Sequence, residues 1–198
     1  MNDRRDLGGL HALVTGATSG LGRATAEALA RRGADVIVHG RNLERGAAVA
    51  DAITAEGGKA RFIAADLNDL PELEELARQA GQADILVNNA GFSWFGPTAD
   101  LEPATFDEMF AANVRSAYYL VAALAPRMAR RGNGCVINLG SMAGQIGPPA
   151  PSTPPGRPRT ASRLLVTPRC WPAPPSPRRL PAPSPSSLPR TPDTSPAR

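Results

Sequence analysis

Proline is distributed so unevenly along this chain that only part of it can fold into regular secondary structure. Of the 21 prolines, 17 lie after residue 147. Proline lacks a backbone N–H donor and restricts the residue before it, so a segment this rich in proline cannot build helix interiors or central strands. The sequence therefore predicts an incomplete but folded domain over residues 1–147 and a disordered, Pro/Arg-rich tail over residues 148–198.

Charge changes at the same point. Residues 1–147 carry 14 Lys/Arg against 17 Asp/Glu, whereas the tail carries eight Arg against Asp193 alone. The basic character belongs to the tail, so it is no argument that the folded part binds nucleic acid. Cys135 and Cys170 make no disulfide framework, and no metal site is predicted. No apolar run reaches membrane-spanning length and no signal-peptide pattern opens the chain, so a cytoplasmic protein is expected.

Five short apolar runs alternate with helical stretches in the folded part, at 10–15, 35–40, 60–66, 84–89 and 135–140. Continuous apolar strands of this kind are typical of a parallel sheet that is buried on both faces. The alternation predicts an α/β fold, a Rossmann-like doubly wound parallel sheet with strand order 3-2-1-4-5. The sixth and later strands are missing from this pattern, so we expect the fifth strand to be an uncovered edge.

Helix boundaries are indicated by capping patterns. A helix over 21–33 should stop at Gly33, and Asp69 with Glu72 resembles a capping box that opens a helix over 70–79. Thr105 and Glu108 suggest a second capping box. A long helix over 113–132 is expected to bury one face, made of Val114, Ala117, Tyr118, Val121, Leu124, Ala125 and Met128, with Tyr118 and Tyr119 as packing residues.

The stretch Thr15–Gly22, "TGATSGLG", follows the first predicted strand and opens the first helix. Gly16 suits a tight turn, while Gly20 and Gly22 would let a phosphate approach the backbone closely. The N–H groups and positive dipole end of the helix would then face a pyrophosphate. The alternative is an ordinary glycine-rich turn, but the strand before it and the helix after it favour a dinucleotide site.

The spacing T-G-x-x-x-G-x-G resembles that of the short-chain dehydrogenase/reductase (SDR) family. Further matches follow in order: "NNAG" over 88–91, Asp66 in "AADL", Asn113, and Ser141 in "INLGSMAG". The resemblance implies Ser141 and Asn113 as catalytic residues, and a cofactor site made of Thr15, Gly16, Thr18, Ser19, Gly20, Leu21, Gly22, Arg41, Asp66, Leu67, Asn89, Ala90 and Gly91. Taken singly, Asn89, Asn113 or Ser141 could equally be structural.

The same resemblance implies an oxidoreductase that reduces small-molecule carbonyls or oxidises alcohols by hydride transfer. Gly40 stands where NAD-preferring relatives carry an acidic residue for the ribose 2′-OH, and Arg41 follows directly. A guanidinium can hold a 2′-phosphate, so NADP(H) is favoured over NAD(H). The alternative is that Arg41 begins a solvated helix with Asn42 as its cap. Relatives are homo-oligomers that pair the long helix with the next one, so that interface should be incomplete here.

Two residues of the family's chemistry are missing. A Tyr and a Lys four residues later are expected about a dozen residues beyond Ser141, but the chain has no Tyr after Tyr119, and its one Lys is Lys59. Lys59 lies before the third strand, at the edge of the sheet opposite the expected site. The enzyme is therefore predicted to be inactive as written.

A shifted reading frame explains both the tail and the missing residues. If translation moves to the last base of the Ser152 codon, codon degeneracy allows Tyr-Ala-Ala-Gly-Lys, 11 to 12 residues after Ser141. The alternative is a non-catalytic nucleotide-binding or interaction protein whose basic tail contacts polyanions or aromatic grooves. The substrate is not indicated. Phe92, Trp94 and Phe95 either line an apolar pocket or pack within a loop.

Overall fold

The computed structural model describes residues 6–141 and the backbone of residues 166–170. Five parallel strands form the sheet that the sequence predicts: β1 (His11–Val14), β2 (Asp35–Gly40), β3 (Lys59–Ala64), β4 (Ile85–Asn88) and β5 (Cys135–Leu139). Their order, β3-β2-β1-β4-β5, confirms the doubly wound arrangement. Because β1 lies at its centre, the loop after β1 opens at the point where the strand order reverses, which is where ligands bind in such sheets.

One strand was not predicted. β6 (Val166–Cys170) pairs antiparallel with β5, with Cys135 opposite Cys170, so β5 is not the uncovered edge that we expected. The expectation that the tail supplies no strand is wrong at these five residues. β6 contains Pro168, and its place at the edge of the sheet fits the rule that prolines within sheets occur mainly in edge strands. The predicted disorder of the rest of 148–198 lies outside the described residues.

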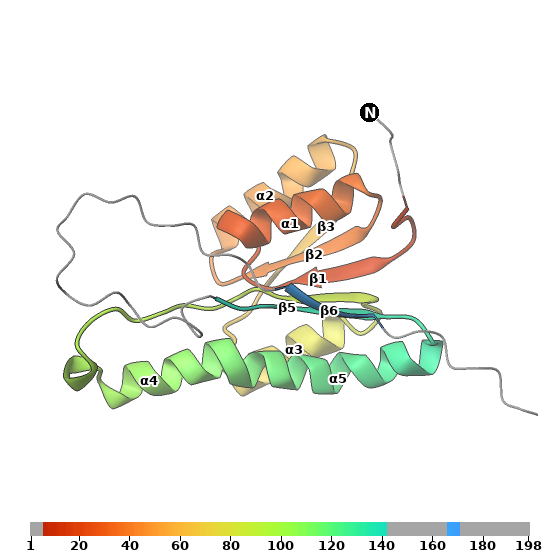
Figure 1. Cartoon of the computed structure of the whole chain (residues 1–198). Coiled ribbons are helices and arrows are strands. Elements are labelled where there is room, and N and C mark those ends of the chain that lie inside the picture. Colours follow the sequence, from red (N-terminus) through yellow and green to blue (C-terminus); the bar gives the residue numbers. More distant parts are fainter. Residues whose placement is uncertain (1–5, 142–165, 171–198) are drawn as a thin grey trace, which may run out of the picture.

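Helices cover both faces of the parallel strands (Figure 1). α1 (Gly20–Arg31) and α2 (Leu43–Ala55) lie on one face, while α3 (Leu70–Gln79), α4 (Pro103–Phe110) and α5 (Ser116–Arg131) lie on the other. Each strand therefore contributes apolar side chains to two cores. In β1, Ala12 and Val14 pack toward α1, and Leu13 packs toward α3 and α5. This two-sided burial explains why the strands read as continuous apolar runs.

The helix caps were predicted with mixed success. Asp69 accepts a hydrogen bond from the Glu72 N–H (2.9 Å), which confirms the start of α3. The second predicted cap is wrong, because α4 begins at Pro103 and Thr105 lies inside it. Proline is favoured in the first helical turn, because backbone N–H groups there have no intrahelical acceptor and proline loses no hydrogen bond by lacking one. This local preference outweighs the Thr105–Glu108 pattern.

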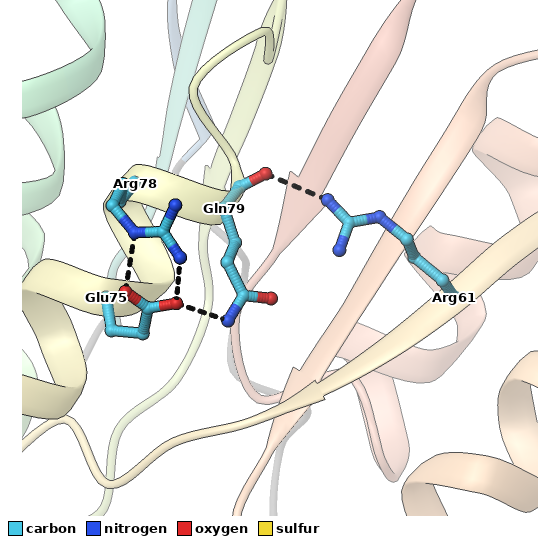
Figure 2. Close-up of polar contacts among 4 residues, drawn as sticks. All are labelled: Arg61, Glu75, Arg78 and Gln79. Atoms are coloured by element: carbon cyan, nitrogen blue, oxygen red, sulfur yellow. Dashed lines mark hydrogen bonds and ion pairs between the residues drawn. The ribbon is translucent and has the colours of Figure 1, made fainter.

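Surface contacts near the end of α3 connect this helix to the sheet (Figure 2). Glu75 accepts hydrogen bonds from Arg78 (Nε to Oε2, 2.6 Å) and from Gln79 (2.7 Å), and Arg61 of β3 donates to the Gln79 carbonyl (2.9 Å). The hydrogen bonds from Arg78 and then Gln79 lower the pKa of Glu75 to about 2. They help to fix α3, whose first turn supports the candidate site described below.

The face that the long helix buries matches the predicted face only in part. A π-helical turn, η2 (Ala111–Arg115), joins α4 to α5. The residues that α5 buries are Ser116, Leu120, Leu124 and Met128, while Val114, Tyr118 and Tyr119 are exposed. The assignment of the two tyrosines as packing residues is therefore wrong. Leu124 and Met128 were predicted correctly, whereas the predicted stripe did not include Ser116 and Leu120. Leu120 and Leu124 share one core with Leu73 and Leu76 of α3, and this contact between distant segments decides which row of the helix is buried.

Candidate functional site

The glycine-rich loop joins β1 to α1 and leaves the start of that helix open. Gly16 and Gly20 have positive φ angles (64° and 54°), so the loop needs glycine at both positions. Ser19 is the N-cap residue but makes no side-chain cap, and the first turn of α1 holds no acidic residue. The first N–H groups of a helix have no intrahelical acceptor. The start of α1 therefore has the donors and the polarity to bind an anion.

Gly22 has a different role from the one expected. A Cβ there would collide with the Asn89 side chain and the Gly16 carbonyl, whereas a Cβ at Gly20 would meet nothing within 4 Å. Gly22 is thus required for packing between the loop and the segment after β4. Gly20 keeps open space above the helix start.

Thr15 and Asn89 hold the glycine loop against the segment after β4. The buried Thr15 Oγ1 accepts hydrogen bonds from the N–H groups of Asn89 and Ala90, both at 3.0 Å. The Asn89 amide donates to the carbonyls of Thr15 (2.8 Å) and Gly16 (3.2 Å). These two predicted cofactor residues therefore act on the shape of the loop.

A hollow of about 470 Å³ lies above the ends of β1, β2 and β3. It brings together residues that are widely separated in the sequence. Of the predicted cofactor residues it is lined by Gly16, Thr18, Ser19, Leu21, Gly22, Arg41, Asp66, Leu67, Asn89, Ala90 and Gly91. Thr15 and Gly20 are not part of its lining. The hollow also includes His39, Arg45 and Asn68, which the sequence analysis did not identify.

Asp66 lies in a loop that neighbouring helices hold in place. Its N–H donates to Glu72 Oε2 (2.6 Å), and its Oδ1 accepts from the Asn68 N–H (3.0 Å). Arg115 of η2 donates to the Asn68 carbonyl (2.6 Å). The second half of the predicted capping box is therefore used differently, because Glu72 reaches the Asp66 N–H and so shapes the wall of the hollow.

Arg41 is exposed at the rim of this hollow, directly after β2. Asn42 caps α2 by accepting from the Arg45 N–H (2.8 Å), as the structural alternative for this segment expected. A Cβ at Gly40 would lie 2.5 Å from Thr18 Cγ2. A side chain at position 40 would therefore fit only if Thr18 moved. The charged residues that line the hollow in and just before α2 are Arg41 and Arg45.

The predicted catalytic residues lie in a second hollow, of about 690 Å³, beside the first. Ser141, after β5, and Asn113, in η2, both line it. The two hollows share Leu21 and the segment 89–92. Both ends of the Asn113 amide are used by Phe92, whose carbonyl accepts from Nδ2 (2.8 Å) and whose N–H donates to Oδ1 (3.0 Å). Asn113 thus positions the wall between the hollows.

The aromatic residues after β4 divide between the two roles considered for them. Phe92 lines both hollows. Trp94 lines neither hollow, and its backbone N–H donates to Met109 Sδ of α4 (3.3 Å). Phe95 is 80% exposed. Lys59 lies at the other edge of the sheet, where it pairs with Asp35 (Nζ–Oδ1, 3.6 Å), so it is far from Ser141 along the strand direction, as expected.

Comparison with known proteins identifies this arrangement. Residues 10–153 match the family model described as short chain dehydrogenase. The chain belongs to the short-chain dehydrogenase family. No helix in the described ranges, 6–141 and 166–170, is long and apolar enough to cross a membrane.

Relatives of known function share the first three quarters of this SDR chain. It is 34% identical over 151 residues to the gluconate 5-dehydrogenase of Gluconobacter oxydans, a match covering 74% of this chain and 59% of that protein. A solved metagenomic short-chain oxidoreductase in complex with NADP is 39% identical, with a TM-score of 0.69, and 72% and 66% of the two chains align. A 7α-hydroxysteroid dehydrogenase complexed with NADH and 7-oxo glycochenodeoxycholic acid is 34% identical, also with a TM-score of 0.69, over 75% and 59%. The aligned part of this chain thus spans about 60% of the length of such relatives.

Proposed function

We propose that this SDR chain binds a nicotinamide dinucleotide across the two hollows, with the phosphates at the start of α1. The observation that carries this proposal is that the open helix start, the Asp66 loop and the segment 89–92 all border one hollow. The cofactor would supply the hydride donor or acceptor. The residues of this chain would bind and orient it, and the relative solved with NADP supports the choice of ligand class.

We further propose that NADP(H) is preferred over NAD(H). Arg41 and Arg45 both line the hollow, so two guanidinium groups are available for a 2′-phosphate. The contact between Gly40 and Thr18 disfavours the carboxylate that would bind a 2′-OH. The family fold itself admits both cofactors, because one similar structure contains NADP and another NADH. Titration of the full chain with NADPH and NADH, followed by fluorescence, tests this preference.

The chain as written is proposed to lack hydride-transfer activity. Asn113 and Ser141 border the hollow where a substrate oxygen would lie, but no Tyr-x-x-x-Lys follows Ser141 in the sequence. Tyr118 borders the same hollow from α5. The only lysine of the chain lies at the opposite edge of the sheet, so Tyr118 has no neighbouring ammonium group of the kind that the family uses. The substrate class is therefore proposed only as small carbonyls or alcohols.

A shift of reading frame near codon 152 remains our proposal for the origin of the tail. The family match ends at residue 153, next to the position where the shifted frame would place a tyrosine codon. Sequencing the gene tests this directly. An alternative frame that encodes Tyr-x-x-x-Lys just after Ser141, followed by further apolar strands, is the expected result, and its absence from both frames would overturn the proposal.

One observation favours the second candidate function, a nucleotide-binding or interaction protein with a tail that has a role of its own. β6 comes from the tail and pairs with β5 over five residues. If this pairing matters, a chain truncated after residue 147 should melt at a lower temperature than the full chain. Equal melting temperatures would leave the frameshift interpretation as the better account.

Homo-oligomerisation is also proposed, on the basis of an exposed apolar stripe. Phe106, Phe110, Val114 and Tyr118 recur every four residues along α4, η2 and α5, and all are exposed. The rings of Phe106 and Phe110 stack with centroids 4.6 Å apart. Sedimentation of the full chain at several concentrations would show whether this stripe leads to assembly.

A further inference from the structure

A histidine is buried in β2, the strand between β1 and β3, near the first hollow. His39 is the second-last residue of β2 and is only 2% exposed. The residue is unusual at such a position because a buried polar ring must find partners for its nitrogen atoms. It has one on each side, in the loops that follow the two strands flanking β2.

The two partners define the protonation of the ring. The Gly16 N–H donates to His39 Nδ1 (3.3 Å), and His39 Nε2 lies 3.1 Å from the Ala65 carbonyl. A backbone N–H can only donate, so Nδ1 must be the unprotonated nitrogen. The ring proton is then on Nε2, where it is donated to the Ala65 carbonyl. Burial favours this neutral form, because it lowers the pKa of His39 to about 4.

Both partners begin the loops that form the walls of the nucleotide hollow. Gly16 opens the glycine-rich loop after β1, and Ala65 precedes Asp66 in the loop after β3. His39, Gly16 and Ala65 all line the hollow. The ring therefore connects two loops beside the last backbone hydrogen bonds to β2, which Ala17 and Ala65 donate to the carbonyls of residues 39 and 40.

We propose that His39 is a positioning residue for the cofactor: its neutral ring holds the glycine loop and the Asp66 loop at the separation that the nucleotide needs. This inference rests on the proposed nucleotide function. It differs from a purely structural role, in which the ring only fills the core. In that case, cofactor affinity would follow overall stability, and a destabilising change elsewhere in β2 would weaken binding as much as a change of His39.

Two substitutions separate the two contacts. His39→Asn places an amide oxygen near the position of Nδ1, so it can keep the Gly16 contact and lose the one to Ala65. His39→Gln places a donor near the position of Nε2, so it can keep the Ala65 contact and lose the one to Gly16. Val38→Ala is the matched control, because Val38 is fully buried in the same strand and packs on the opposite core.

Amide hydrogen exchange of the full chain without ligand reports the Gly16 contact directly. We expect the Gly16 N–H to exchange faster in His39→Gln and to stay protected in His39→Asn. The Ala17 N–H is an internal reference, because it donates to the backbone carbonyl of residue 39 (2.8 Å) in every variant. The chain has two histidines, so the ¹⁵N spectrum of labelled histidine can show whether His39 carries its proton on Nε2.

NADPH titration then tests the link to the cofactor. A net hydrogen bond corresponds to roughly a fivefold change in an equilibrium, so each histidine variant should bind NADPH about fivefold or more weakly. Val38→Ala should lower the melting temperature and leave NADPH affinity within about twofold of the parent value. The proposal is overturned if Val38→Ala weakens binding as much as the histidine variants do, or if Gly16 exchange is unchanged in His39→Gln. If the parent chain binds no NADPH, the proposed function fails, while the exchange and ¹⁵N measurements still decide whether His39 connects the two loops.

Discussion

The side-chain amide of Asn113 pairs with both backbone groups of Phe92, donating to its carbonyl at 2.8 Å and accepting from its N–H at 3.0 Å. The pair joins the π-helical turn η2 to the segment after β4, which forms the wall between the two hollows. The Asn113 side chain thus pairs with the backbone of Phe92 in the way that a neighbouring strand would. The position of this wall depends on η2 being in place.

Asn113→Ala should loosen the segment 89–96 with little effect on the rest of the sheet. Both hydrogen bonds are partly solvated, so we expect a loss of about 1–2 kcal/mol in the free energy of unfolding and a several-fold weaker NADPH affinity. Urea denaturation and NADPH titration measure the two effects. Asn113→Asp keeps only the acceptor and should fall between the parent and the alanine variant. An alanine variant that binds NADPH like the parent would contradict this assignment.

Thr15→Val should destabilise the protein strongly although the two side chains have the same shape. Valine leaves the N–H groups of Asn89 and Ala90 without the Oγ1 that accepts from both, in a site where Thr15 is 1% exposed. An unsatisfied buried donor costs about 1–3 kcal/mol, so the free energy of unfolding should fall by about 2–4 kcal/mol. Thr15→Ser restores the oxygen and should cost only about 1 kcal/mol for the missing methyl group. Chemical denaturation of both variants is the measurement, and equal losses would show that the hydroxyl is unimportant.

Arg41→Asp should reduce or reverse the preference for NADPH over NADH. The substitution replaces a cation at the rim of the hollow with a carboxylate, which repels a 2′-phosphate and can accept from a 2′-OH. The ratio of the two dissociation constants is the quantity to measure. Arg31→Asp is a suitable control, because Arg31 is an exposed arginine at the far end of α1. Tighter binding of NADH than of NADPH by the parent chain would refute the role given to Arg41.

The stability of the protein should fall on mild acidification because of His39. Burial lowers the pKa of its ring to about 4, although its hydrogen bond to Ala65 and the nearby Asp66 carboxylate act in the opposite direction. In the unfolded chain the histidine has its ordinary pKa of about 6.5, so between pH 6.5 and 4 it is protonated there and neutral in the folded chain. Stability is therefore fully present above about pH 6.5, decreases between pH 6.5 and 4, and loses roughly 3 kcal/mol over that range. Thermal unfolding of the parent and of His39→Gln tests this, since the variant should lack most of the slope between pH 6.5 and 5.

Correcting the reading frame near codon 152 should create the activity that the chain as written lacks. A positioned acid or base contributes about 10²–10⁴ to a rate, and the chain has neither the expected Tyr nor the expected Lys. We expect no NADPH oxidation by the parent chain with a panel of carbonyl substrates. The corrected chain should oxidise NADPH with at least one of them, and a Tyr→Phe change at the restored position should remove this activity. Carbonyl reduction by the parent chain would contradict the proposal.

Elements whose identity depends on short-range properties were predicted well. The five parallel strands could be located because two-sided burial leaves a continuous apolar run in the sequence, as in β2 and β4. The start of α3 could be located because Asp69 caps it through a contact three residues away. The glycine loop could be placed between a strand and a helix because its positive φ angles require glycine, and Gly16 and Gly20 can be recognised in the sequence.

Features that depend on residues far apart in the sequence were missed or assigned wrongly. The strand β6 could not be foreseen, because it exists only through pairing with β5 and its own residues have no apolar period. The buried face of α5 was assigned only in part, because its contact with α3 buries Leu120, and neither Leu120 nor Ser116 was included in the predicted stripe. The side chain of Glu72 was expected to complete a capping box, but it accepts from the Asp66 N–H instead. His39 gave no signal of its own, since its significance comes from Gly16 and Ala65, in the loops after two other strands.

By itself, then, the sequence determined the five parallel strands, the start of α3 and the place of the glycine-rich loop, since each depends on periodicity, backbone conformation or a contact within one helical turn. It also determined that no Tyr-x-x-x-Lys follows Ser141 in this chain. Only the tertiary structure decided that Arg41 and Asp66 line the first hollow, that Thr15 supports it from below its lining, and that Asn113 holds the wall between the two hollows. The physical reason is that a hydrogen bond or a close contact between residues 20 to 75 positions apart forms only after the strands have been brought side by side, and no local pattern in the chain records it.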